Sequence, residues 1–95
     1  MMSKYVLDYT AVFKKDLKHA KKCGYDMRLL NDIVNRLQNG EVLPERNKDH
    51  PLSGNWKGYR ECHIQPDWLL VYRYFDSQLI LSLTRTGSHS YLKLD

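Results

Sequence analysis

The chain lacks the features that mark secreted, membrane and repetitive proteins. It has only two cysteines, Cys23 and Cys62, in 95 residues. We expect reduced thiols in a cytoplasmic protein, although one bridge between the two is also compatible with the sequence. The first residues contain no uninterrupted apolar run, which argues against a signal peptide, and no segment approaches the length of a membrane span. Without linkers, internal repeats or low-complexity tracts, residues 1–95 should form a single domain with no membrane partner.

An excess of negative charge is also absent, and the excess of positive charge is local. Residues 1–28 carry seven Lys or Arg against three Asp, whereas residues 29–95 carry eight charges of each sign. Apolar residues make up 42% of the chain, which is typical of a globular protein rather than a disordered one. The uneven charge predicts an anionic partner that meets the N-terminal part of the chain. A solvated, lysine-rich helix face is the alternative.

The N-terminal part of the chain predicts a strand followed by two helices. Tyr5, Leu7 and Tyr9 alternate with Val6 and Asp8, and this two-residue period indicates a strand. Thr10 is a plausible N-cap for a helix to about Lys22, which Gly24 closes. The apolar face of this helix is Phe13, Leu17 and Ala20, and its basic face is Lys14, Lys18, Lys21 and Lys22.

A second helix is predicted over residues 27–38, with Asp26 as its cap and Gly40 after its end. Its apolar stripe is Leu30, Ile33, Val34 and Leu37. Because few residues separate the two helices, they should form an antiparallel hairpin. The pattern is then lost over residues 41–57, where we expect a long loop without regular structure because of Pro44 and Pro51. This loop contains His50.

Three further strands are predicted over residues 59–65, 68–75 and 78–86, with turns at Pro66-Asp67 and Asp76-Ser77. These strands should form an antiparallel meander. Glu61 and His63 should share one face of the first strand, and Leu79, Leu81 and Leu83 form a row in the third whose next member is Arg85. The predicted order is β-α-α-β-β-β, an α+β domain in which an antiparallel sheet packs against an N-terminal helical hairpin.

Residues suited to acid–base chemistry on a phosphate gather in two segments. Residues 49–68 hold two histidines, three carboxylates, two tryptophans, a lysine and an arginine, and residues 85–89 add Arg85 and His89. Imidazole exchanges protons near neutral pH, and guanidinium neutralises an anion. We therefore predict that the two segments converge on one phosphodiester-cleaving site. RNA supplies its own 2′-hydroxyl nucleophile, so two imidazoles and a guanidinium suffice without a metal or another cofactor.

A structural zinc site is the competing interpretation of four histidines and two cysteines. Cys62 and His63 are adjacent on a predicted strand, so their side chains should point to opposite faces. The chain has no Cys-x2-Cys or His-x3-His pair, and the spacing therefore argues against zinc.

The sequence closely resembles the YafQ branch of the RelE/ParE toxin superfamily over essentially its whole length. The resemblance is carried by the stretches Asp49-His-Pro-Leu-Ser-Gly-Asn-Trp-Lys-Gly-Tyr-Arg-Glu-Cys-His-Ile-Gln-Pro-Asp-Trp-Leu-Leu-Val-Tyr72 and Arg85-Thr-Gly-Ser-His89. It implies the fold of the RelE-like microbial ribonuclease toxins and a bacterial type II toxin that cuts mRNA on the ribosome. Its implied partners are the ribosome, mRNA and an antitoxin of the DinJ kind.

The resemblance also implies roles for individual residues. His89 matches the family's C-terminal histidine and is expected to be the general acid, with Arg85 as the phosphate clamp. His50, His63 and Asp67 match positions that the family uses. Which of them is the general base stays open, since Asp67 is either the base or the partner that orients a histidine. Trp68 is expected to stack on an unpaired base.

Other contacts with RNA are expected around this site. Lys57 and Arg60 are candidates for phosphate contacts, with plain surface charge as the alternative. Relatives often carry an aromatic residue four positions beyond the last histidine. That position is Lys93 here, so Tyr91 is the candidate for the same stacking place. The basic helix face is expected to contact ribosomal RNA.

A second functional class is compatible with the same scaffold. Some ParE-like toxins are not catalytic and instead bind DNA gyrase or another protein. Such a binder has no need of His50, His63 and His89 together, which favours the ribonuclease.

Overall fold

The computed structural model describes residues 3–94, and its helices and strands confirm the predicted α+β class. The main elements are β1 (Val6–Tyr9), α1 (Ala11–Lys22), α2 (Met27–Gln38), β2 (His50–Pro51), β3 (Arg60–Gln65), β4 (Trp68–Phe75), β5 (Ile80–Gly87) and α3 (His89–Leu92). Three short 3-10 turns lie between them, η1 (Glu45–Asn47), η2 (Gly54–Trp56) and η3 (Asp76–Gln78).

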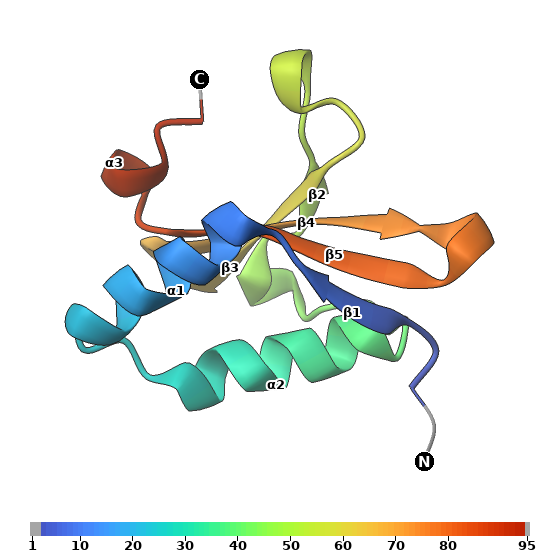
Figure 1. Cartoon of the computed structure of the whole chain (residues 1–95), viewed down its shortest axis with the longest axis horizontal. Helices are drawn as coiled ribbons and strands as arrows, with labels where there is room; N and C mark the ends of the chain where they lie inside the picture. The colour runs from blue at the N-terminus through green and yellow to red at the C-terminus, as the bar shows by residue number, and fades with distance from the viewer. Residues whose placement is uncertain (1–2, 95) are drawn as a thin grey trace.

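Both long helices begin at the caps that the sequence predicts. The Thr10 hydroxyl accepts a hydrogen bond from the backbone N–H of Phe13 at 2.9 Å, and the Asp26 carboxylate accepts one from that of Arg28 at 3.0 Å. Gly24, with a φ of +81°, takes the left-handed conformation that ends α1. α1 and α2 then run in opposite directions, and the two helices diverge with distance from the turn that connects them (Figure 1).

The five strands form one sheet in the order β1-β5-β4-β3-β2. β3, β4 and β5 form the predicted antiparallel meander, but β1 pairs with β5 in parallel, so the prediction of a wholly antiparallel sheet is wrong for this pair. The reason is the crossover between them: the helices and the first two meander strands carry the chain across the sheet and back before β5 meets β1.

The segment from residue 41 to residue 57 is more regular than predicted. His50 and Pro51 form β2, which pairs antiparallel with β3 through His50 opposite Glu61 and Pro51 opposite Arg60. Proline lacks an N–H but is tolerated in an edge strand, and β2 lies at the edge of the sheet. The expectation that Pro51 excludes regular structure is therefore wrong.

The two faces of the sheet have different neighbours. The inner face packs on α1 and α2, and its core includes Cys62, Trp68, Leu70, Tyr72, Leu81 and Leu83 together with the predicted α2 stripe Leu30, Ile33, Val34 and Leu37. Each of the buried aliphatic side chains contributes about 1.5–3 kcal/mol through its removal from water. α3 and the loop around η2 rise on the side away from α2, which we call the outer face (Figure 1).

A β-bulge in β5 decides which face Arg85 joins. Val71 of β4 is opposite Arg85 but the next residue, Tyr72, is opposite Leu83, so Thr84 is an extra residue in β5. The extra residue reverses the alternation, and Arg85 lies on the outer face with Val71 rather than in the inner row with Leu83. The prediction that Arg85 continues the leucine row is therefore wrong. Leu79 also leaves that row, since it lies before β5 in a left-handed turn.

Candidate active site on the outer face of the sheet

Two neighbouring rows of residues cross the outer face and carry most of the predicted site. In one row the cross-strand partners are His50, Glu61, Val71 and Arg85, from β2 to β5. In the next row they are His63, Leu69 and Gly87. Directly opposite residues project from the same face, so His50, His63 and Arg85 share one surface. Three strand spacings, roughly 14 Å, separate the two ends of the first row.

His89 stands beside these rows because Asp67 holds it there. One Asp67 carboxylate oxygen accepts the backbone N–H of His89 at 2.9 Å and lies 2.5 Å from its ring Nδ1. The backbone N–H of His89, followed by its ring, keeps the pKa of Asp67 below its usual value. The imidazole rings of His89 and His63 are 5.6 Å apart between centroids. The end of β3, the turn after it and the start of α3 therefore bring two imidazole rings and a carboxylate within reach of one ligand.

The rings of His63 and His50 each contact a backbone carbonyl, and this contact determines which ring nitrogen carries the proton. His63 Nδ1 lies 3.1 Å from the backbone carbonyl of Pro66, and His50 Nδ1 lies 2.7 Å from that of Lys48. A carbonyl can only accept a hydrogen bond, so each neutral ring carries its proton on Nδ1 and keeps a lone pair on Nε2. Both rings are thus oriented with a basic nitrogen away from the carbonyl.

Glu61 links His50 to the rest of the site. Its carboxylate lies 3.7 Å from His50 Nε2, and it lines a surface hollow together with Leu69, His89 and Leu92. A protonated His50 would form an ion pair with Glu61. The strand alternation in the sequence predicts that Glu61 shares a face with His63, but Glu61 was not among the predicted site residues. Its position between His50 and His63 in the sequence is the signal that could have identified it.

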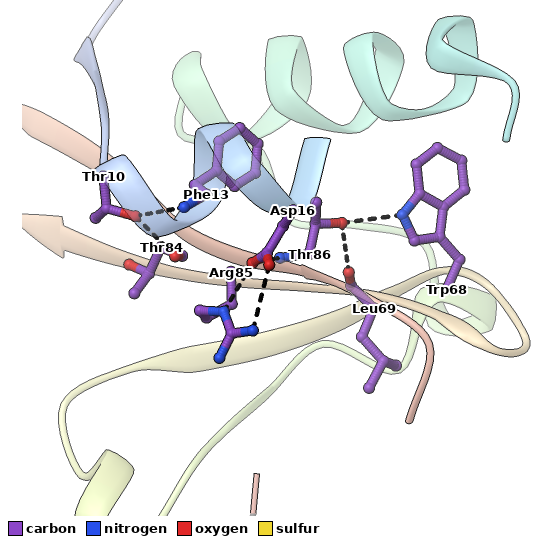
Figure 2. A network of polar contacts seen from close by, with 8 residues as sticks. All are labelled: Thr10, Phe13, Asp16, Trp68, Leu69, Thr84, Arg85 and Thr86. Atoms are coloured by element: carbon purple, nitrogen blue, oxygen red, sulfur yellow. Dashed lines mark hydrogen bonds and ion pairs between the residues drawn. The ribbon is translucent and has the colours of Figure 1, made fainter. Parts of the chain in front are cut away.

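Arg85 is held by a carboxylate that the sequence pattern did not single out. Asp16 of α1 accepts hydrogen bonds from Arg85 Nε at 2.7 Å, from Arg85 Nη2 at 3.2 Å and from the backbone N–H of Thr86 at 3.2 Å (Figure 2). Asp16 is 2% exposed, and its hydrogen bonds raise the pKa of Arg85 further. A signal for this ion pair was present in the sequence, because Asp16 lies three residues after Phe13 on the apolar face of α1. A carboxylate buried there requires a cationic partner.

The same contacts close the open edge of β5. β1 pairs with residues 80–83, so within residues 3–94 the later part of β5 pairs with β4 on one edge and has no strand on the edge that β1 occupies earlier. α1 takes its place, because the Thr10 hydroxyl donates to the carbonyl of Thr84 at 2.8 Å and Asp16 accepts from Thr86 (Figure 2). The bonds to Asp16 fix the Arg85 guanidinium on its Nε–Nη2 side, and its Nη1 end remains available to bind an anion.

One face of the Tyr91 ring, in α3, packs against α1. The ring stacks on that of His19 with centroids 4.3 Å apart and planes 8° apart, and the residue is 36% exposed. A Cβ added to Gly87 would lie 2.5 Å from Tyr91 Cδ2, and the φ of Gly87 is +155°, so only glycine suits this position. Partial burial and the nearby Asp16 carboxylate raise the pKa of Tyr91. The ring face that stacks on His19 is not available to a base.

Two predicted substrate contacts lie on the inner face of the sheet, opposite to His63. Trp68 is 1% exposed, and its indole N–H donates to the Thr86 hydroxyl at 2.9 Å on the inner face (Figure 2). It cannot stack on RNA, because its strand position points it into the core. Arg60 also points inward, opposite Tyr72, and its Nε lies 3.3 Å from Asp49. The prediction for Trp68 is wrong, since the alternation of β4 assigns its side chain to the covered face. The side chain of Arg60 is 38% exposed, and its phosphate contact stays a prediction, on the face of the sheet opposite to His63.

The remaining predicted contacts are exposed. Lys57 lies at the end of η2, and the four lysines of the basic face of α1, Lys14, Lys18, Lys21 and Lys22, are all open to solvent. The exposed lysines are compatible with contacts to an anionic partner. Trp56, next to Lys57, is not among the predicted contacts; it is partly buried against Tyr59, edge to face, at 5.3 Å between centroids.

The cysteines take no part in this site. Both thiols are free, Cys23 at the surface and Cys62 in the core, where burial raises the pKa of its thiol. Within residues 3–94, no group of three or more His, Cys, Asp or Glu side chains is arranged to hold a metal ion. Across the same described residues, every helix is too short or too polar to cross a membrane.

Comparison with known proteins identifies the family. A family model described as the bacterial toxin of type II toxin–antitoxin systems, YafQ, matches residues 5–94. The chain is 42% identical over 87 residues to the mRNA interferase toxin YafQ of Escherichia coli K12, a match that covers 90% of this chain and 92% of the relative.

Solved structures agree in fold. The YafQ chain in the crystal structure of the E. coli DinJ–YafQ toxin–antitoxin complex is 41% identical, with a TM-score of 0.85 over 94% of this chain and 97% of that one. A metal-bound toxin from Helicobacter pylori is 43% identical, with a TM-score of 0.87 over 93% and 98% of the two chains. The resemblance seen in the sequence is thus confirmed, and the chain belongs to the YafQ family of bacterial toxins of type II toxin–antitoxin systems.

Proposed function

We propose that this toxin is an endoribonuclease that cuts mRNA on the ribosome by acid–base catalysis without a metal. The observation that carries the proposal is the gathering of His63, His89 and Arg85 on one sheet face, with Asp67 bonded to His89. The E. coli relative at 42% identity is named an mRNA interferase, which supports the same substrate here. The protein would act in the bacterial cytoplasm, where ribosomes and mRNA are found.

In the proposed reaction a basic imidazole removes the proton of the RNA 2′-hydroxyl. The 2′-oxygen attacks the adjacent phosphorus, the bond from phosphorus to the 5′-oxygen breaks, and His89 gives its proton to that leaving oxygen. The products are a 2′,3′-cyclic phosphate and a 5′-hydroxyl. Asp67 contacts both the backbone and the ring of His89, which supports an orienting role for it rather than that of the base.

Arg85 would stabilise the charge that builds on the phosphate. Its Nε–Nη2 side is bound to Asp16, so the guanidinium has little freedom left and its Nη1 end can donate to a phosphate oxygen. A donor that is already oriented costs no reorganisation when the transition state forms.

His63 is the favoured base. It is the imidazole next to His89, and its contact with Pro66 leaves Nε2 unprotonated in the neutral ring. His50 is the alternative, and its approach to Glu61 suits a cationic ring that contacts phosphate. The two roles predict different pH profiles: loss of the base removes the acidic limb, whereas loss of a cation mainly weakens binding.

The proposal includes two macromolecular partners. The exposed basic face of α1 would contact ribosomal RNA, since it holds the local charge excess of the chain. A cognate antitoxin would neutralise the toxin by direct binding, as supported by the DinJ–YafQ complex of the E. coli relative.

The decisive experiment compares wild-type toxin, His89→Gln and the matched surface control Arg36→Gln in bacteria, with mRNA ends mapped after induction. Arg36 lies on α2 beside Asp32, away from the outer face. We expect cuts in translated frames for the wild type and the control, and none for His89→Gln. Growth arrest by the wild type with intact messages would instead favour the gyrase-binding class.

A further inference from the structure

Arg73 occupies the outer face next to the proposed catalytic rows and has no role in them. It follows Val71 by two residues on β4 and lies opposite Ser82 of β5. Two residues along a strand span roughly 7 Å, so Arg73 is one step along the same face from the row that holds Arg85. Its partners in that third row are Ser82 and Asp8, since Asp8 of β1 pairs with Ser82.

Arg73 differs from the other partly buried arginines in its partners. Arg36, Arg60 and Arg85 each lie within 4 Å of a carboxylate. Within residues 3–94, Arg73 has no carboxylate at that distance and no hydrogen bond from its guanidinium. A guanidinium that is partly removed from water without an anion is poised to accept one.

Aromatic rings hold this guanidinium in place. Its carbon lies 5.2 Å from the ring centroid of Tyr59 and 4.9 Å from that of Phe75, both at cation–π distance. A Cβ added to Gly58, whose φ is +96°, would lie 3.3 Å from the same carbon, so the loop backbone also packs closely. Trp56 braces Tyr59 edge to face. Phe75 is 38% exposed, which leaves ring surface for a further stacked group.

We propose that Arg73 and Phe75 form a subsite for the nucleotide next to the cleaved bond. Arg73 would bind a backbone phosphate of single-stranded RNA, and Phe75 would stack on the attached base. A rigid cation beside an open aromatic ring is the combination that binds single strands without sequence preference. This inference rests on the proposed ribonuclease function, because the strand must run along β4 to pass from the subsite to His63 and His89.

The test measures binding of a short single-stranded RNA whose cleavable position carries a 2′-deoxyribose, by fluorescence anisotropy over a range of salt concentrations. Each phosphate contact contributes about 0.7 to the slope of log affinity against log salt. We expect Arg73→Gln to lower the slope by about 0.7 and to weaken binding about tenfold at low salt. Phe75→Leu should weaken binding about tenfold with an unchanged slope, because it removes stacking and no charge.

Two controls separate the subsite from other effects. Arg73→Lys keeps the charge and should keep the slope, whereas Arg36→Gln removes an equal charge on α2 and should bind as the wild type does. Thermal unfolding establishes that each variant is folded. Equal slopes and affinities for wild type and Arg73→Gln would overturn the subsite, as would the absence of measurable binding by the wild type at low salt.

Cleavage assays distinguish failure of the subsite from failure of the proposed function. In translating ribosomes, Arg73→Gln should raise KM several-fold with kcat preserved, whereas His89→Gln should abolish cleavage. Wild-type cleavage with an unaltered KM for Arg73→Gln would disprove the subsite alone. Absence of any cleavage by the wild type would count against the ribonuclease itself, and the RNA-binding slopes would still decide whether Arg73 meets phosphate.

Discussion

Asp67 illustrates how one exposed carboxylate can organise a site. Its side chain is open to solvent, yet one oxygen contacts both the backbone N–H and the ring of His89. An aspartate directly before a strand is ordinarily a turn former, and Asp67 follows Pro66 in the turn before β4. Its contribution to function therefore depends on the residue that α3 places over it.

We predict that Asp67→Asn lowers kcat about 10²-fold while KM stays near the wild-type value. The amide can still accept the backbone N–H of His89 but no longer offers a negative charge to its ring, so His89, the proposed general acid, loses its orientation. Single-turnover cleavage measures the effect. Because Asp67 acts through His89, the double variant Asp67→Asn/His89→Gln should be no slower than His89→Gln alone; additive effects would contradict the orienting role.

The contact between Asp67 and His89 should make the attachment of α3 depend on pH, with a loss of stability toward acid. The N–H groups of His89 hold the pKa of Asp67 below 3.8 in the folded protein. The attachment of α3 is then fully stabilised above the unfolded pKa and is lost as pH falls through the lower folded value. The amide resonance of His89 should report this release in the acid range below about pH 4, and the release should be missing in Asp67→Asn.

At the level of secondary-structure elements, the contact between α1 and the end of β5 fixes the position of Arg85. β1 stops at the residue opposite Leu83, the bulge follows at Thr84, and α1 supplies Thr10 and Asp16 to the open edge. The bulge turns Arg85 to the outer face, and Asp16 holds it there. Neither feature acts without the other, because a bulge alone would leave the guanidinium free to move.

We predict that Asp16→Asn lowers the free energy of unfolding by about 2–3 kcal/mol, because Arg85 and the N–H of Thr86 are deprived of a buried, charged acceptor. The matched control is Asp32→Asn, which removes an exposed pair with Arg36 and should cost less than about 0.5 kcal/mol. Denaturant unfolding measures both variants.

Cleavage adds a readout that a purely structural role would not change. Asp16→Asn should lower kcat in the wild-type background and have no further effect on kcat in Arg85→Gln, where no guanidinium remains to be oriented. Equal reductions of kcat in both backgrounds would show that Asp16 does not act through Arg85.

For the whole molecule, the distribution of functional groups over its faces is the main feature. The outer face carries His50, His63, His89 and Arg73, the inner face is covered by helices, and the lysines of α1 are exposed to solvent. The net charge of +4 arises within residues 1–28. A protein with the proposed catalytic face and a separate basic helix can bind a substrate strand and a large anionic particle together.

We predict that replacing Lys14, Lys18, Lys21 and Lys22 with glutamine weakens ribosome binding and flattens its salt dependence. Every lysine–phosphate pair that the substitutions remove should reduce the slope by up to about 0.9. Sedimentation with ribosomes at several salt concentrations measures the slope. Binding of the short RNA to the outer face should change little, which separates ribosome recognition from substrate binding. An unaltered ribosome affinity would exclude the lysine face as the ribosome-binding surface.

Much of this molecule followed from its sequence. Both helix caps, the α2 stripe, the span of β4 and the shared face of Glu61 and His63 come from interactions within a few residues, where periodicity and capping chemistry dominate. The spacing of His50, His63, Asp67, Arg85 and His89 pointed to the family and to the residues that now share the outer face.

Tertiary structure alone decided the rest. The parallel pairing of β1, the strand at His50, the bulge at Thr84 and the pairing of Asp16 with Arg85 join residues far apart in the chain, and local propensity carries no information about such partners. The burial of Trp68 and the aromatic cradle of Arg73 have the same origin. A side chain's local pattern states which way it can point, but only its packed neighbours determine whether that direction leads to core, to solvent or to a substrate.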